Sequence, residues 1–291
     1  MANNMYNPWH GCHKISEGCR NCYMYFLDKE HGIETPSDQV VRNKSGFLLP
    51  IEKRRDGSFK IQPGGKVNLC RTSDFFVEDA DPWRKQVWSM VKYRSDLIWD
   101  ILTKRPERFA ECLPDDWGDG YENVLLGVTT ENQETADRRI PILLNTPAKH
   151  KYINCAPFIG PVTLPENLSG IDHIGCGGEN YDGCRICKEE WVRNLSDQCR
   201  NLGIAFCFYE TGTCYEKDGI VYTMKTKAVQ SRQAYLSGLS HDGAPAKPFL
   251  LKTVDGVPME PDTPVFYGKN CSTCGNRPVC HGCRYCGKCK P

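Results

Sequence analysis

The sequence predicts an α/β fold: a TIM-like complete or partial (β/α) barrel followed by a small cysteine-rich metal-binding module. Three observations indicate this fold class. Strand-like and helix-like segments alternate between residues 66 and 209, polar residues gather where the predicted strands end, and six cysteines follow residue 270. Such alternation is typical of βαβ units and a parallel sheet. A doubly wound open sheet is the alternative, because it is built from the same units.

Six segments are expected to be strands, since each is short, largely apolar and bounded by polar or turn-forming residues. These segments are 66–70, 97–102, 123–129, 151–155, 171–176 and 204–209. The expected helices are 23–31, 82–93, 136–144 and 189–202, and Pro106 begins a further helix. The helix at 189–202 has the clearest pattern, with Trp191, Leu195 and Cys199 at four-residue spacing and Gly203 after its end.

Length and composition fit a globular protein. The 291 residues can bury one large core, or one core and a small satellite domain. A formal net charge of +1 gives no general attraction to nucleic acid or to an anionic membrane. No apolar run approaches the roughly 20 residues that span a bilayer, and the N-terminus lacks the pattern of a signal peptide. We therefore expect a cytoplasmic protein with no membrane partner.

Three regions are expected along the chain: a barrel domain at 1–210, an irregular segment at 211–268 and a cysteine-rich tail at 269–291. The middle region has no clean helical period and contains Gly, Pro and charged turns. We expect it to cover one end of the barrel.

The chain contains eighteen cysteines. In a reducing compartment they are not expected to form disulfides, and five C-x2-C pairs indicate metal binding instead. Isolated cysteines on apolar stretches are expected to be small buried side chains. These are Cys112, Cys155, Cys199 and Cys207.

The most informative stretch is near the N-terminus, where Cys12, Cys19 and Cys22 have the spacing C-x6-C-x2-C. Three thiols without a nearby fourth suit an iron–sulfur cube held at three corners, which leaves one iron open. Glycines directly precede Cys12 and Cys19, and they are expected to let the backbone curve around a bulky cluster. The alternative is one half of a zinc site that is completed from elsewhere.

The tail is expected to be a second metal site, because so short a segment cannot form an apolar core. It contains five Lys or Arg residues and no Asp or Glu, which suits a negatively charged thiolate site. Zinc and a second [4Fe–4S] cluster both remain open. The candidate ligands are Cys271, Cys274, Cys280, Cys283, Cys286 and Cys289, to which Cys184 and Cys187 could be added.

Polar residues at the carboxyl ends of the predicted strands mark the expected pocket. In both α/β architectures the ligand site lies at that end of the sheet. The residues expected to bind cofactor or substrate there are Ser73, Thr103, Lys104, Thr129, Glu131 and Glu179.

Several short sequence motifs follow one another along the chain. They are Asn-Pro-Trp at 7–9, the cysteine stretch to Tyr23, and the segments 102–108, 127–132, 136–141 and 177–179. In this combination the chain resembles a phage- and prophage-associated three-cysteine-motif family of unassigned function. That family resembles radical S-adenosylmethionine enzymes such as spore photoproduct lyase. The resemblance covers about residues 5–210, and the tail lies outside it.

The resemblance implies a barrel of the radical S-adenosylmethionine type. It implies that Cys12, Cys19 and Cys22 hold a [4Fe–4S] cluster whose open iron binds S-adenosylmethionine, and that reduction yields a 5′-deoxyadenosyl radical. An electron donor such as a flavodoxin or a ferredoxin would then be a partner. Two features depart from the usual radical-enzyme pattern: the first gap is six residues rather than three, and Asn21 precedes the last cysteine.

The leading interpretation is therefore a radical S-adenosylmethionine enzyme whose substrate the sequence does not identify. One alternative is a non-catalytic phage accessory protein that binds zinc or nucleic acid, with both cysteine groups structural. Another is a cluster enzyme that cleaves S-adenosylmethionine at a different bond or only transfers electrons.

Overall fold

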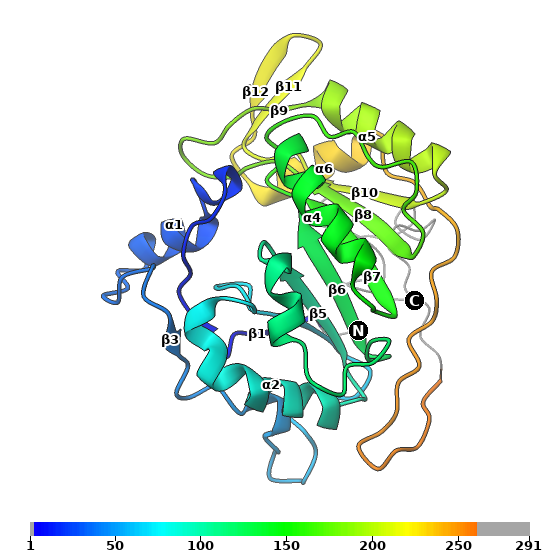
Figure 1. Ribbon diagram of the computed structural model, residues 1–291. Coiled ribbons are helices and arrows are strands. Elements are labelled where there is room, and N and C mark those ends of the chain that lie inside the picture. The colour runs from blue at the N-terminus through cyan, green and yellow to red at the C-terminus, as the bar shows by residue number, and fades with distance from the viewer. Residues whose placement is uncertain (1–2, 261–291) are drawn as a thin grey trace.

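The computed structural model describes residues 3–260, and it is built around a seven-stranded parallel sheet (Figure 1). The strands are β1 (Asn3–Tyr6), β4 (Lys66–Leu69), β5 (Ile98–Thr103), β6 (Val124–Thr129), β7 (His150–Cys155), β8 (Ile171–Gly177) and β10 (Ala205–Glu210). Their order across the sheet is β1-β4-β5-β6-β7-β8-β10, and each neighbouring pair is parallel. The α/β class is confirmed.

Strand order separates the two expected architectures. The strands follow one another across the sheet in chain order, whereas a doubly wound sheet reverses its order at a switch point. The sheet is also open, because within residues 3–260 β1 pairs with β4 and β10 pairs with β8, but β1 and β10 do not pair. The fold is therefore a half-barrel rather than a complete barrel or a doubly wound sheet.

Helices pack against the convex side of the half-barrel, as Figure 1 shows. The longest are α2 (Asp81–Tyr93), α4 (Gln133–Asn145) and α5 (Glu189–Asn201). Their apolar faces share one hydrophobic core with every second residue of the strands, including Trp99, Leu126 and Phe206. Because side chains alternate across a strand, the intervening residues face the concave side.

The lower end of the concave side is closed by apolar contacts. Phe249 and Leu251 pack against Ile98 and Leu125, which lie at the amino ends of β5 and β6, and against Tyr152. The segment that contains Phe249 and Leu251 thus covers one end of the half-barrel. The carboxyl ends of the strands remain available for a site.

Region 211–268 contains regular structure within its described part, which the sequence analysis did not predict. It forms the antiparallel pair β11 (Cys214–Lys217) and β12 (Ile220–Thr223) and the helix α6 (Lys227–Leu236). These elements are short and β12 is exposed along its whole length, so they lack the apolar periodicity on which the prediction relied. Strand β1 was missed for the same reason.

The remaining elements are short. They are β2 (Trp9–His10), η1 (Glu17–Cys19), α1 (Tyr23–Glu30), β3 (Val41–Arg42), η2 (Leu49–Ile51), η3 (Glu78–Ala80), η4 (Pro106–Arg108), α3 (Phe109–Cys112) and β9 (Cys187–Lys188). No helix in the described part of the chain is long and apolar enough to cross a lipid bilayer.

The isolated cysteines lie where the sequence predicted. Cys112, Cys155, Cys199 and Cys207 are all buried. Burial disfavours the thiolate and raises the pKa of Cys112, Cys155 and Cys199, for Cys155 to about 12. They are packing residues.

Candidate functional site

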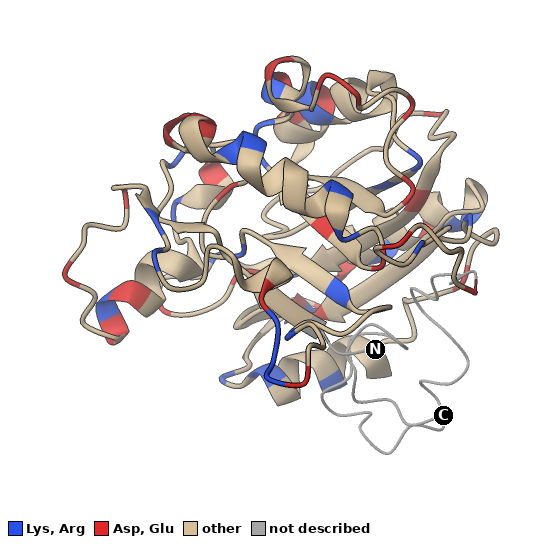
Figure 2. Ribbon diagram, turned by 90° about the horizontal axis from the view of Figure 1, so that it is seen from below, with Lys and Arg blue, Asp and Glu red and all other residues tan. Residues whose placement is uncertain are grey.

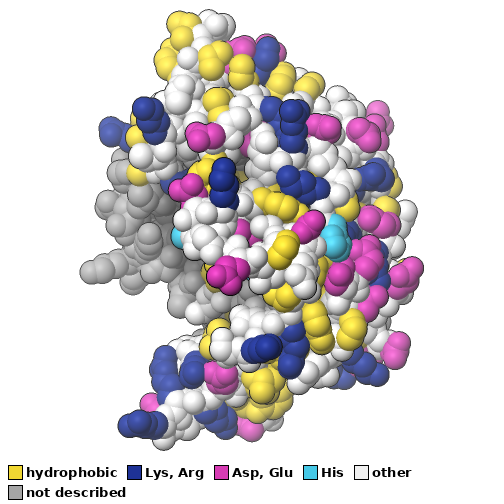
Figure 3. Space-filling model, turned by 90° about the vertical axis from the view of Figure 1, so that its left-hand side faces the viewer, with side chains coloured by type: hydrophobic (Ala, Val, Ile, Leu, Met, Phe, Trp, Pro, Cys, Tyr) yellow, Lys and Arg dark blue, Asp and Glu magenta, His cyan; other side chains and the backbone are white. Residues whose placement is uncertain are grey.

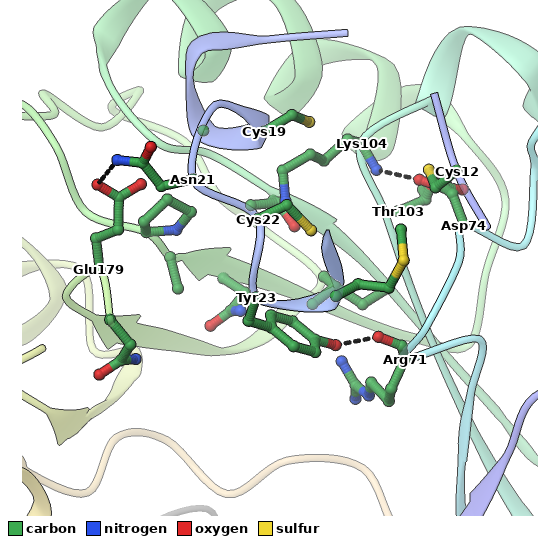
Figure 4. A pocket seen from close by; sticks show the side chains of 18 of the residues that line it. Cys12, Cys19, Asn21, Cys22, Tyr23, Arg71, Asp74, Thr103, Lys104 and Glu179 are labelled. Atoms are coloured by element: carbon green, nitrogen blue, oxygen red, sulfur yellow. Dashed lines mark hydrogen bonds between the residues drawn. The ribbon is translucent and has the colours of Figure 1, made fainter. Parts of the chain in front are cut away.

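A cavity of about 290 Å³ lies at the carboxyl ends of the strands, and Cys12, Cys19 and Cys22 all line it. We call it the cysteine cavity. In Figure 4 Asn21 and Glu179 lie on one side of the three cysteines, and Asp74 lies on the other. The sequence prediction that the cysteine loop and the strand ends meet at one cavity is thus matched by the geometry.

The cysteine loop leaves β1 and is fixed at several backbone positions. The amide of Gly11 donates to Thr72 O at 3.2 Å, and that of Cys12 donates to Ser37 O at 2.9 Å. The indole of Trp9, which is fully buried, donates to Asp74 O at 3.1 Å. The start of the loop is therefore tied to the exit of β4 and to the segment around Ser37.

The two glycines of the loop are required by neighbouring protein atoms. Gly11 has a φ of +93°, and a Cβ there would overlap the backbone of Gln39. A Cβ on Gly18 would overlap the side chain of Glu131. Close packing alone thus excludes a side chain at both positions, and the expectation that these glycines also give room for a cluster stays a prediction.

Cys12 lies beside the ion pair of Arg105 and Asp74. Nη1 of Arg105 lies 3.5 Å from its Sγ, and the same guanidinium lies 3.5 Å from Asp74. The pKa of the Cys12 thiol is raised to about 12, chiefly by burial and also by Asp74, while Arg105 opposes both. Arg105 and Asp74 were not among the residues expected to bind a cofactor, although both directly adjoin residues that were.

Cys19 and Cys22 lie around the start of α1. Cys19 ends the short helix η1, and its Sγ lies 3.6 Å from Ser16 Oγ. Cys22 is the residue at the N-terminal cap of α1, without a side-chain hydrogen bond to the helix. The positive end of a helix dipole favours a negative group, so this position suits a thiolate bound to metal.

Five of the six residues expected to bind a cofactor line the cysteine cavity: Ser73, Thr103, Lys104, Thr129 and Glu179. Asp74 organises two of them, since it accepts from Thr103 Oγ1 at 2.7 Å and from the Lys104 amide at 3.0 Å. The end of β5 is thereby fixed against the exit of β4. The side chain of Lys104 extends its Nζ to 3.9 Å from Glu131 Oε1.

Glu131 is not among the residues that line the cavity. Its fully buried carboxylate instead accepts from Ser16 Oγ at 2.7 Å and from Arg139 Nη1 at 2.9 Å. Burial opposes ionisation, but Lys104 and Arg139 prevail and lower the pKa of Glu131. Glu131 therefore anchors the cysteine loop through its hydrogen bond with Ser16.

Glu179 links the cavity wall to the cysteine loop. Its buried carboxylate accepts from Asn21 Nδ2 at 3.0 Å and from Arg185 Nε at 2.9 Å. Arg185 in turn donates to Glu17 O at 2.9 Å. Burial raises the pKa of Glu179, but the hydrogen bonds from Arg185 and Asn21 outweigh it and lower the pKa below its ordinary value.

Cys184 and Cys187, the other predicted cysteine pair, do not line the cavity. Cys187 is buried in the hydrophobic core, and Cys184 is half-buried beside Cys214. The six tail cysteines lie outside the described residues. Within residues 3–260, no three His, Cys, Asp or Glu side chains are grouped so that they could hold a metal ion.

A family model described as "Protein of unknown function (DUF5131)" matches residues 1–245 of the chain. Neither the curated proteins nor the solved structures contain a match.

Proposed function

We propose that this chain, which belongs to the DUF5131 family of proteins of unknown function, is a radical S-adenosylmethionine enzyme with a [4Fe–4S] cluster on Cys12, Cys19 and Cys22. One observation carries the proposal. Three thiols that lie close together in sequence line the same cavity as five polar residues from the ends of four strands.

The donor set of the cavity suits such a cluster. A single metal ion draws its sulfur ligands to about 2.3 Å from one point, whereas a cube binds each thiolate to a different iron. Three thiols that line one cavity can bind three corners of a cube. Arg105, at 3.5 Å from Cys12 Sγ, would compensate the negative charge of the bound thiolates.

The polar residues divide into two groups around the thiols. Ser73, Thr103 and Lys104 lie at the exits of β4 and β5, and Glu179 lies beyond β8. A cationic side chain opposite a carboxylate can orient a ligand that carries both an amino and a carboxylate group. Tyr23, whose hydroxyl donates to Arg71 O, and Met24 lie along the same wall and would exclude water.

When bound and reduced, such a cluster would supply the one electron that splits S-adenosylmethionine into methionine and a 5′-deoxyadenosyl radical, and the protein would contribute position and shielding. A flavodoxin or a ferredoxin is the proposed reductant.

Iron analysis of anaerobically reconstituted protein tests the cluster. We expect about four irons per chain at the N-terminal site, and Cys12→Ala, Cys19→Ala or Cys22→Ala should each remove most of the near-400-nm absorbance assigned to it. Cys199→Ala, at a buried thiol in the core, is the matched control and should keep the iron. A triple variant with full iron content that loses only zinc contradicts the proposal.

The tail is proposed as a second metal site, a [4Fe–4S] cluster or zinc. Shortening the chain after Tyr267 distinguishes the two. Loss of about four further irons indicates a second cluster, and loss of zinc with unchanged iron indicates a structural zinc site.

A further inference from the structure

Two cysteines from distant parts of the chain lie side by side outside the cysteine cavity. Cys184 belongs to the loop between β8 and β9, and Cys214 is the first residue of β11. Their side chains share a hydrogen bond, and both are half-buried. Two thiols that already touch, although they are about 30 residues apart in sequence, can be joined by a disulfide with little movement of the backbone.

Backbone contacts hold the two segments in this position. On one side of the pair, the amide of Thr213 donates to Glu179 O at 2.8 Å. On the other side, Cys187 and Tyr215 are partners in the parallel pairing of β9 and β11. The two cysteines lie between these fixed points, so the fold itself brings their thiols together.

The C-x2-C spacing indicated a different grouping, in which Cys184 and Cys187 act together. In the structure Cys187 is 0% exposed and belongs to the hydrophobic core, whereas the side chain of Cys184 contacts Cys214. Cys214 lies in no C-x2-C motif. The neighbour of Cys184 is therefore a residue that the spacing did not indicate.

We propose that Cys184 and Cys214 form a reversible disulfide, with a low-molecular-weight disulfide such as oxidised glutathione as the oxidant. The thiolate of one cysteine attacks a sulfur of the oxidant and releases one small thiol. The other cysteine then attacks this mixed disulfide and releases the second. Two protein thiols are oxidised, and the oxidant takes up the two electrons and two protons to become two thiols. Transient, redox-sensing pairs are the disulfides that a reducing compartment allows.

The disulfide would fasten a segment that holds the cysteine loop. Glu179 accepts from Asn21, which it faces in Figure 4, and Arg185 donates to Glu17 O. Cys184 lies in the same segment, directly before Arg185. A bond to Cys214 would tie the segment to β11. This inference concerns a modification outside the proposed cluster site and needs neither the cluster nor S-adenosylmethionine.

Surface charge does not oppose such an oxidant. The pair lies beside β9 and β11, which are adjacent at the upper end of the molecule in Figure 1. The outer surface shows Lys and Arg interspersed with Asp and Glu (Figures 2 and 3). Oxidised glutathione, which is anionic, therefore meets no broad surface of a single charge.

Anaerobic incubation of the full chain in buffers of oxidised and reduced glutathione tests the site. Burial and the neighbouring Cys214 raise the pKa of the Cys184 thiol to about 12, so the samples should equilibrate overnight. After acid quenching and alkylation, peptide mapping should show a Cys184–Cys214 crosslink that increases with oxidised glutathione and disappears when dithiothreitol is added. The crosslinked chain should unfold at a temperature at least about 3 °C higher than the reduced chain.

Two variants sharpen the test. Cys214→Ser should lose both the crosslink and the rise in unfolding temperature. Cys187→Ala, which changes the other member of the C-x2-C motif, should keep the crosslink. The crosslink should also form in protein that lacks Cys12, Cys19 and Cys22.

Four outcomes overturn the inference: no crosslink at any glutathione ratio, a Cys184–Cys187 crosslink in its place, glutathione that stays attached to either cysteine without closing the bridge, or zinc or iron that is lost when Cys184 or Cys214 is replaced by Ser. A bridge in protein that binds no iron would keep this site while rejecting the proposed function. Cleavage of S-adenosylmethionine by a chain that never forms the bridge would do the reverse.

Discussion

Replacing Asp100 with Asn tests the charge cluster on the concave face. The carboxylate lies on β5, accepts from Lys66 and Arg71, and also accepts from the Tyr152 hydroxyl at 2.5 Å. The substitution keeps the size of the side chain and removes its charge. Lys66 and Arg71 then remain in a largely buried place without their shared counter-ion.

The size of the effect follows from the pKa of Asp100. Burial raises it, but Lys66 and Arg71 outweigh burial and lower it from 3.8 to about 2. This difference corresponds to about 2 kcal/mol of stability at neutral pH. Loss of one member of a buried ion pair costs about 3–5 kcal/mol. Asp100→Asn should therefore lower the free energy of unfolding by about 2–5 kcal/mol.

Urea denaturation at neutral pH measures the loss. Asp197→Asn is the control, because that side chain is 58% exposed, and it should change stability by less than about 1 kcal/mol. Combining Asp100→Asn with Lys66→Met should restore part of the stability, since one unpaired cation is removed. A loss below about 1 kcal/mol for Asp100→Asn refutes the reasoning.

The pH dependence of this loss has a definite sign. The folded-state pKa is depressed, so the carboxylate stabilises the fold above the unfolded value of 3.8, and this contribution is lost as the pH falls to about 2. The difference between the two proteins should shrink within that window. A difference that grows there is inconsistent with an ionised Asp100.

Three further substitutions test other parts of the fold. Asn132→Ala removes the capping box at the start of α4 and should cost about 1 kcal/mol in urea denaturation; an unchanged midpoint argues against the cap. Gly127→Ala places a methyl group against the Tyr152 ring and should cost about 1–3 kcal/mol, whereas unchanged stability means that the ring can move away. Arg94→Met leaves Asp96 unpaired, where the two side chains are 0% and 1% exposed, and should cost about 3–5 kcal/mol by calorimetry; a stabilised variant shows that the pair is not needed.

Much of the sheet could be predicted because its strands are short apolar runs between polar or glycine-containing turns. The expected bounds 171–176 and 204–209 differ by a residue at the ends from the observed β8 and β10. The carboxyl ends of parallel strands meet at one edge, so local sequence also indicated which polar residues surround the cysteines.

Other parts depend on contacts between distant residues, which local patterns do not contain. Arg105 reaches Cys12 across 93 positions, and Glu131 supports the loop through Ser16 across 115 positions. A second cavity, on the concave face of the half-barrel, arises only when five strands place alternate side chains on one face. Pattern reasoning named Glu131 as a lining residue because it follows a strand, but it could not show which way the carboxylate turns.

The most direct measurement of the central claim is the detection of 5′-deoxyadenosine after anaerobic, iron-loaded protein is reduced with dithionite in the presence of S-adenosylmethionine. The proposed function predicts that this product forms with the unaltered chain and with Cys199→Ala, and that it is abolished in Cys12→Ala, Cys19→Ala and Cys22→Ala. Protein that carries its full iron content and is fully reduced, yet neither binds S-adenosylmethionine nor yields 5′-deoxyadenosine, would contradict it.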